Sequence, residues 1–175
     1  MFANKMNLMT RNAKYADIVE NELYNRFLSG MSLDGKKFFY GSVTKIASPE
    51  NFESSSGFDL TSSSNYRKDW YTVPCCPPNI LRWLSSIENY IYATGTNSVY
   101  VNQYVSSNTS VSIKSGNVGI NQESNYPWDG DIKIEVNPES DSKFTVNLRI
   151  PSWVEDKPVP GDLYSYINKS SAKPI

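Results

Sequence analysis

The spacing of apolar residues changes after Gly95, and this change most constrains the fold of the 175-residue chain. Before Gly95 the apolar residues recur every three to four positions, which is the period of an amphipathic helix. After Gly95 they alternate with polar residues, which is the period of a half-buried strand. The sequence therefore predicts an α+β protein, with a helical part in residues 1–94 and a β part in residues 95–175.

Three helices are predicted in the helical part. The clearest covers residues 13–28, with an apolar face and Gly30 behind it as a stop. A second covers residues 2–9, although no capping residue precedes it. Pro77 opens the third, which we expect to run to about residue 92, because the fixed φ of proline suits the first turn of a helix.

The segments between the helices are predicted from their turn residues. Residues 32–43 favour a hairpin with its turn at 33–36, and the Ser-rich residues 48–65 favour a surface loop. In the β part, short strands separated by turns indicate an antiparallel β-sandwich. The expected strands are 99–104, 111–113, 132–136 and 144–150. Because a sandwich needs more strands, and because the helical faces lack partners, we expect a piece of a larger protein.

Composition excludes several functions. The chain has no histidine, which removes the commonest general base and zinc ligand, and its net charge of −1 argues against nucleic acid as a partner. No window approaches the ~20 apolar residues of a membrane span, and the N-terminus lacks the apolar core of a signal peptide. We therefore expect a soluble chain that does not bind membranes, while its localisation stays unknown.

Cys75 and Cys76 are the two cysteines of the chain, and they stand directly before the predicted helix that starts at Pro77. Passive packing is the plainer interpretation of such a pair, since thiols are often buried. A disulfide between them is disfavoured by the ~3.8 Å spacing of neighbouring Cα atoms. A helix N-terminus also favours a reactive thiolate, and two thiolates are half of a zinc site.

Glu20 departs from the pattern of its helix, because at ~100° per residue it falls inside the apolar face. A carboxylate there must be paired, protonated or functional. We consider two interpretations: an ion pair with a buried arginine or hydrogen bonds from tyrosine hydroxyls, and a role in a catalytic pocket. Asp17, Asp34 and Asp69, by contrast, are expected on solvated faces and in turns.

Several segments resemble glycoside hydrolase family 127, the β-L-arabinofuranosidases. The most specific is Cys75-Cys-Pro-Pro-Asn-Ile80, and the resemblance keeps its order over about residues 1–155. The other matching segments are residues 15–25, 29–40, 90–93, 125–130 and 148–153, together with Trp70. The resemblance implies the end of an (α/α) barrel followed by a β-sandwich portion.

The same resemblance implies a chemistry. Family members hydrolyse non-reducing β-L-arabinofuranosyl groups with retention, using a cysteine nucleophile on zinc and a glutamate as acid/base. By position, Cys75 matches the nucleophile and a zinc ligand, Cys76 matches a further zinc ligand, and Glu20 and Tyr40 match residues that hold the sugar. Arabinofuranosyl glycans or glycoconjugates are thus the implied partners.

The departures from the family pattern concern the missing half of this site. The Glu-x-Cys element with the remaining zinc ligands, the acid/base glutamate and the pocket histidines are absent. We therefore expect an incomplete zinc site, an isolated chain with almost no activity, and self-association through unfilled helical faces. The alternative is a carbohydrate-binding or structural β-sandwich fragment with non-catalytic cysteines. Its sugar-stacking residues would be Tyr100, Tyr104, Tyr126 and Trp128.

Overall fold

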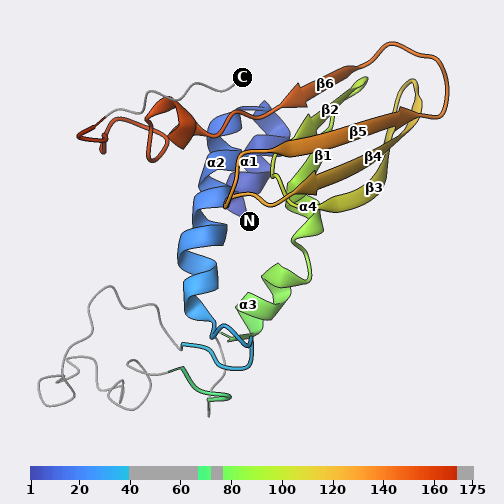
Figure 1. Ribbon diagram of the computed structural model, residues 1–175. Helices are drawn as coiled ribbons and strands as arrows, with labels where there is room; N and C mark the ends of the chain where they lie inside the picture. Colours follow the sequence, from blue (N-terminus) through green and yellow to red (C-terminus); the bar gives the residue numbers. More distant parts are fainter. Residues whose placement is uncertain (40–66, 72–76, 169–175) are drawn as a thin grey trace, which may run out of the picture. The chain divides into compact units, whose positions relative to one another are not determined.

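The computed structural model describes residues 1–39, 67–71 and 77–168 (Figure 1). The chain divides into two compact units, one formed by Met1–Glu20 with Ile87–Ile175 and the other by Asn21–Ser86. Helices precede the sheets along the chain, so the predicted mixed α+β class is confirmed. No helix in these described ranges is long and apolar enough to cross a membrane.

The two predicted N-terminal helices are present. α1 spans Phe2–Thr10 and ends at Arg11, which adopts a left-handed conformation. α2 spans Ala13–Asn21, and the helical backbone then continues as a π-helix, η1 (Glu22–Phe27), and a 3₁₀ turn, η2 (Leu28–Gly30). The predicted extent of helical backbone, 13–28, is therefore confirmed. The regular α-helix ends at Asn21, and it is followed by the wider π-helical turn and the tighter 3₁₀ turn, of a kind common at helix ends.

The prediction of one helix from Pro77 to about residue 92 is wrong at its C-terminal end. α3 spans Pro77–Leu84, and a separate turn, α4, spans Glu88–Ile91. The hydroxyls of Ser85 and Ser86 donate to the backbone carbonyls of residues 82 and 83. Such side-chain bonds compete with the helical backbone and favour a break. Proline opens α3, as predicted.

The hairpin turn lies where it was predicted, in residues 33–36. Gly35 has a φ of 70° and its N–H donates to the Ser32 carbonyl, while the Asp34 carboxylate accepts from the Lys36 N–H. Within the described residues, the two arms pair at the bridge of Met31 with Phe38. The remainder of the predicted hairpin, from residue 40, and the predicted loop at 48–65 lie outside the described residues.

Two three-stranded sheets make up the β part. The strands are β1 (Tyr92–Thr94), β2 (Ser98–Val101), β3 (Ser107–Ile113), β4 (Gly116–Ser124), β5 (Ile132–Pro138) and β6 (Thr145–Leu148). The first sheet has the order β1-β2-β6 and the second the order β3-β4-β5. Every pair is antiparallel except β2 with β6, which is parallel. The predicted antiparallel arrangement is therefore confirmed for every pair but this one, which is parallel because β6 returns from the second sheet to the first.

The sequence predicted neither β1 nor β4, and β4 is the longer of the two. Its inward positions include Val118 and Ile120, but the next one is Gln122, and Gly119 lies between the two apolar residues. A polar inward residue and a glycine weaken the period-two signal. Gln122 is nevertheless buried, because its amide nitrogen donates to the carbonyls of Gln103 and Val105.

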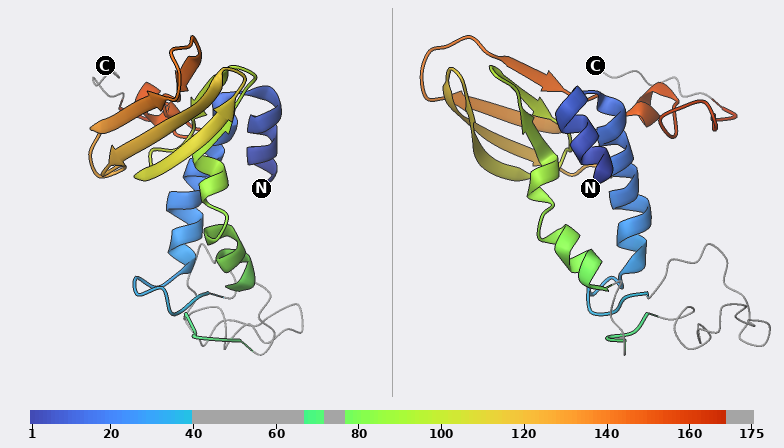
Figure 2. Two further views of the ribbon diagram at one scale, coloured as in Figure 1. Left: turned by 90° about the vertical axis from the view of Figure 1, so that its right-hand side faces the viewer. Right: turned by 180° about the vertical axis from the view of Figure 1, so that it is seen from behind.

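The β core lies between the two sheets, whose arrangement Figure 2 shows from two further sides. Val99 of β2 packs with Val118 and Ile120 of β4, and all three side chains are fully or almost fully buried. Partly buried residues surround them: Tyr92, Val111, Ile113, Ile134, Val136 and Phe144. This packing of apolar residues from both sheets is the main apolar contact that holds the β part together.

Gly116 provides a test of the hairpin between β3 and β4. Its φ of 124° is a conformation that other residues rarely adopt, whereas an added methyl group would meet no atom closer than 3.7 Å. We expect Gly116→Ala to lower the free energy of unfolding by about 1–2 kcal/mol through backbone strain alone. Urea unfolding measures this, with Gly130→Ala as the control. Equal stability of the two variants would contradict the assignment of strain to Gly116.

Candidate functional site

The predicted site residues divide into two groups. Tyr40, Cys75 and Cys76 lie outside the described residues, whereas Glu20 lies within α2. The helix that follows the cysteines, α3, starts at Pro77 as the sequence predicted. The structure therefore supports the helix start beside the cysteines, and it describes the surroundings of Glu20 in detail.

Glu20 is buried in the helix face, as its place on the helical wheel indicated. It is 6% exposed, and Ala16 and Val19 beside it on α2 are also buried. Asp17 lies three positions earlier, so the two carboxylates share one side of the helix. The side chain of Asp17 is 10% exposed, which corrects the expectation that it lies on a solvated face.

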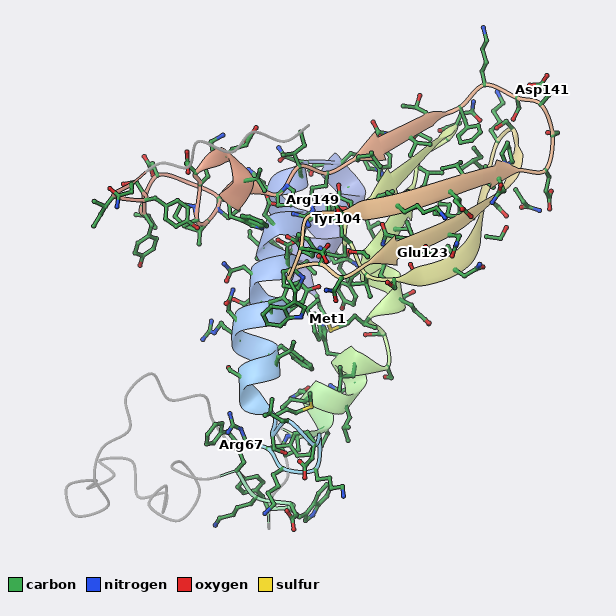
Figure 3. All side chains as sticks on the ribbon, in the orientation of Figure 1. Met1, Arg67, Tyr104, Glu123, Asp141 and Arg149 are labelled. Carbon is green, nitrogen blue, oxygen red and sulfur yellow. The ribbon has the colours of Figure 1, made fainter. Side chains whose placement is uncertain are left out.

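Arg149 forms ion pairs with both carboxylates, so its single positive charge offsets one of the two negative charges, and its side chain is 2% exposed. Its Nη1 donates to Asp17 Oδ1 at 2.6 Å, its Nη2 donates to Glu20 Oε2, and its Nε donates to the carbonyl of Asn102 at 2.5 Å. All three guanidinium nitrogens therefore have an acceptor. Figure 3 shows Arg149 and Tyr104 beside each other next to α2.

Aromatic side chains enclose the ion pairs. The Tyr126 hydroxyl donates to Glu20 Oε1 at 2.8 Å, and Trp153 Nε1 donates to the same oxygen at 3.1 Å. The Tyr104 ring centroid lies 5.7 Å from the guanidinium carbon of Arg149 and 5.7 Å from the Tyr126 ring centroid. We refer to these residues as the Arg149 cluster: Asp17, Glu20, Tyr104, Tyr126, Arg149 and Trp153.

The electrostatics of the Arg149 cluster follow from burial and from two carboxylates facing one cation. Burial raises the pKa of Asp17, although Arg149 acts in the opposite direction. Burial by itself would lower the pKa of Arg149, but Glu20 and Asp17 outweigh it and the pKa is raised. Burial and the Glu20 charge raise the pKa of Tyr126, so its hydroxyl stays a donor.

Nothing in the local sequence singles out Arg149, and the alternation of buried apolar and exposed polar residues around it is inverted in the structure. Leu148 and Ile150, its apolar neighbours, are exposed, while the arginine between them is buried. The two carboxylates on α2 account for this, because a buried guanidinium needs acceptors. One signal was available: Asp17 stands three positions before the buried Glu20, and a pair of buried carboxylates requires a cation.

The raised pKa of Asp17 leads to a prediction about pH. The folded state binds this proton more tightly than the unfolded state, whose pKa is near 3.8, so acidification favours folding through Asp17, and the effect is lost as the pH rises through the raised pKa. The stability of the wild type relative to Asp17→Asn should therefore be greater near pH 4 than near pH 7. Urea unfolding at a series of pH values measures the difference.

Asp34 is the control for this prediction, because the hydrogen bond from Ser32 lowers its pKa. Relative to Asp34→Asn, the wild type should lose stability on acidification, which is the opposite trend. Parallel pH profiles for the wild type and Asp17→Asn would show that Asp17 does not titrate differently on folding.

The described residues form no metal site of their own. Within residues 1–39, 67–71 and 77–168, no group of three or more His, Cys, Asp or Glu side chains is placed to hold a metal ion. Cys75 and Cys76, the predicted zinc ligands, lie outside the described residues. Zinc binding by this chain remains a prediction.

The predicted sugar-stacking residues do not form one exposed platform. Tyr104 is 7% exposed, and its hydroxyl donates to the Arg149 carbonyl. Tyr126 is engaged with Glu20, and the Arg11 guanidinium lies 5.3 Å from the centre of the Tyr100 ring. Trp128, at 85% exposure, is open to solvent. The alternative of an aromatic sugar-binding surface therefore depends mainly on Trp128.

Comparison with known proteins gives matches over both parts of the chain. A family model described as the β-L-arabinofuranosidase GH127 catalytic domain matches residues 1–89, and the GH127 middle-domain model matches residues 98–167. A non-reducing end β-L-arabinofuranosidase from Bifidobacterium longum subsp. longum is 34% identical over an aligned length of 176 residues, and the match covers 93% of this chain.

Solved structures agree with these matches. A GH127 β-arabinofuranosidase superposes with a TM-score of 0.77 at 35% identity over 96% of this chain. A GH127 β-L-arabinofuranosidase from Geobacillus stearothermophilus T6 superposes with a TM-score of 0.74 at 40% identity over 86% of the chain. The chain spans about a quarter of the length of these relatives: 26% of the Bifidobacterium protein, and 24% and 23% of the two structures.

Proposed function

Since the chain belongs to glycoside hydrolase family 127, the β-L-arabinofuranosidases, we propose that it supplies part of the active site of a retaining, zinc-dependent enzyme. Its substrates are glycans or glycoconjugates that end in β-L-arabinofuranosyl groups. The observation that carries this proposal is the ordered match to both family domains, which includes the cysteine pair directly before α3.

Cys75 is the proposed nucleophile. Its sulfur bonds to the anomeric carbon of the sugar while the bond from that carbon to the leaving oxygen breaks, and water later displaces the sulfur. The N-terminus of α3, opened by Pro77, favours the thiolate form through the positive end of the helix dipole. Zinc, when bound by Cys75 and Cys76, supplies positive charge that keeps both sulfurs deprotonated.

Glu20 and Tyr40 are the proposed sugar-binding residues. Within the described residues, Glu20 accepts three hydrogen bonds, two on Oε1 and one on Oε2. A carboxylate has about four acceptor positions, so one position on Oε2 is left for a sugar hydroxyl. The buried ion pair and a role in binding sugar are therefore compatible for Glu20.

The leaving oxygen must take a proton from an acid, and this chain has no residue matching the family's acid/base glutamate. We therefore propose that the isolated chain is nearly inactive and binds zinc weakly. The exposed apolar side chains of α1, which include Phe2 and Met9, support self-association as a further proposal.

Hydrolysis and metal content test the proposed inactivity. We expect the purified chain, supplied with zinc, to hydrolyse 4-nitrophenyl β-L-arabinofuranoside at close to the background rate, because general acid catalysis alone contributes about 10²- to 10⁴-fold. Atomic spectroscopy should find less than stoichiometric zinc. Turnover that disappears in Cys75→Ala, together with one bound zinc per chain, would overturn this prediction.

A covalent probe tests the proposed nucleophile without requiring turnover. An L-arabinofuranosyl haloacetamide should alkylate Cys75 faster than plain iodoacetamide does, and excess L-arabinose should protect it, as followed by mass spectrometry. Cys76→Ser keeps the nucleophile and is the matched control for Cys75→Ser. If the sugar group gives no advantage, and glycan binding survives both substitutions, the carbohydrate-binding alternative is favoured instead.

A further inference from the structure

The Arg149 cluster joins segments that the two family models assign to different domains. Asp17 and Glu20 lie in the part matched by the catalytic-domain model, residues 1–89. Tyr126, Arg149 and Trp153 lie in the part matched by the middle-domain model, residues 98–167. Every hydrogen bond that the Glu20 carboxylate accepts within the described residues comes from the middle-domain side.

The guanidinium of Arg149 is held from several directions. Its Nε is bound to the Asn102 carbonyl, and its backbone N–H donates to the Val101 carbonyl at 3.2 Å. The Tyr104 hydroxyl donates to the carbonyl of Arg149 itself. With both the backbone and the side chain anchored, the two remaining nitrogens point at Asp17 and Glu20 in one orientation.

The ion pairs of the Arg149 cluster differ from the other salt bridges of the described residues in being buried. Elsewhere in the described part of the chain, both partners of each salt bridge are 46% or more exposed. In the Arg149 cluster the three charged side chains are 2%, 8% and 10% exposed. Buried ionic groups add little net stability, but they can specify one geometry, since any other arrangement leaves a charge unpaired.

We propose that Arg149 is a positioning residue for Glu20. Through Arg149, with Tyr126 and Trp153, the middle domain orients the Glu20 carboxylate so that its one remaining acceptor position faces the sugar. This proposal rests on the proposed function in assigning a sugar to Glu20, but the positioning itself is a property of the described residues. Lysine cannot replace Arg149, because a single ammonium group does not reproduce the fork that spans two carboxylates.

The Trp153 indole N–H reports on the orientation of Glu20, because it is shared between Glu20 Oε1 at 3.1 Å and the Tyr126 hydroxyl at 3.0 Å, which itself donates to Glu20. In ¹H–¹⁵N spectra of the whole chain, we expect Arg149→Lys to shift the Trp153 indole resonance and to accelerate its hydrogen exchange. The Trp128 indole, which is exposed, should not change. Lys133→Met is the matched control, because Lys133 also bridges two carboxylates, Glu123 and Glu135, but is 61% exposed.

An unchanged Trp153 indole signal in folded Arg149→Lys would overturn the proposal, since Glu20 would then keep its orientation without the guanidinium. If Arg149→Lys does not fold, the same measurement applies to Arg149→Gln combined with Asp17→Asn, which removes one buried charge of each sign. Dispersed backbone amide signals establish that either variant is folded before its indole signals are compared.

Titration with L-arabinose separates this proposal from the proposed function. Glu20→Gln and Arg149→Lys should each weaken sugar affinity by about tenfold or more, the size expected for a hydrogen bond to a charged group, and the double variant should be no weaker than the single ones. Weakening by Glu20→Gln but not by Arg149→Lys would overturn the positioning role. Absence of sugar binding by the wild type would count against the proposed function, and the indole signals would still decide the positioning.

Discussion

Arg149→Met is expected to lower the free energy of unfolding by about 3–5 kcal/mol, because it leaves Asp17 and Glu20 as buried carboxylates without a counter-charge. It also leaves the Asn102 carbonyl without the donor that Nε supplies. Urea unfolding of the wild type and the variant measures the difference. Lys133→Met, which removes an exposed cation between two carboxylates, should cause no measurable loss.

The same experiment has an internal check. If unpaired buried charge causes the loss, then the triple variant Arg149→Met, Asp17→Asn, Glu20→Gln should recover part of the stability, since no buried charge is left. A loss in Arg149→Met no larger than that in Lys133→Met would show that the Arg149 cluster is not desolvated in solution.

Tyr104→Ala is the second substitution with a large expected effect. Tyr104 is almost fully buried, and its ring lies against the Arg149 guanidinium and the edge of Tyr126. Removing the ring should lower the free energy of unfolding by about 3–5 kcal/mol, through lost transfer energy and an unfilled cavity. The experiment is again urea unfolding, with the change in midpoint compared at constant slope.

Tyr104→Phe separates the ring from the hydroxyl, which donates to the Arg149 carbonyl. It should cost only about 1 kcal/mol, the net value of one hydrogen bond. If the two variants lost the same stability, the hydroxyl rather than the ring would be the important group, and the Tyr104 ring would add no packing energy to the Arg149 cluster.

Local sequence was sufficient for the helices and most strands. Pro77 opens α3 because proline's φ and missing N–H act within a single turn. Gly35 marks the predicted turn for an equally local reason, its positive φ. The secondary-structure predictions were wrong where side chains bond to the backbone or enter the core. The hydroxyls of Ser85 and Ser86 bond to the backbone where α3 ends, and Gln122 occupies an inward position in β4.

For the candidate site, too, the sequence predicted the part that depends on local residues and not the part that depends on distant contacts. The helical period showed that Glu20 must be buried, and it offered an ion pair with an arginine as one explanation. Glu20 does pair with an arginine, but the identity of that residue, Arg149, depended on a contact across 129 positions of the chain. Asp17 was assigned to solvent because no neighbour in the sequence explains its burial; Arg149 and the Ser152 N–H do.

The sequence by itself determined that a helical part precedes a β part, the family, and the cysteine pair beside a helix start, because periodicity, proline chemistry and motif matches are all readable along the chain. Only the tertiary structure decided which sheet β6 joins, which face of β6 is buried, and that Asp17 and Glu20 share one arginine. The physical reason is that a buried charge is tolerated only beside its counter-charge, and folding brings that partner from a distant segment.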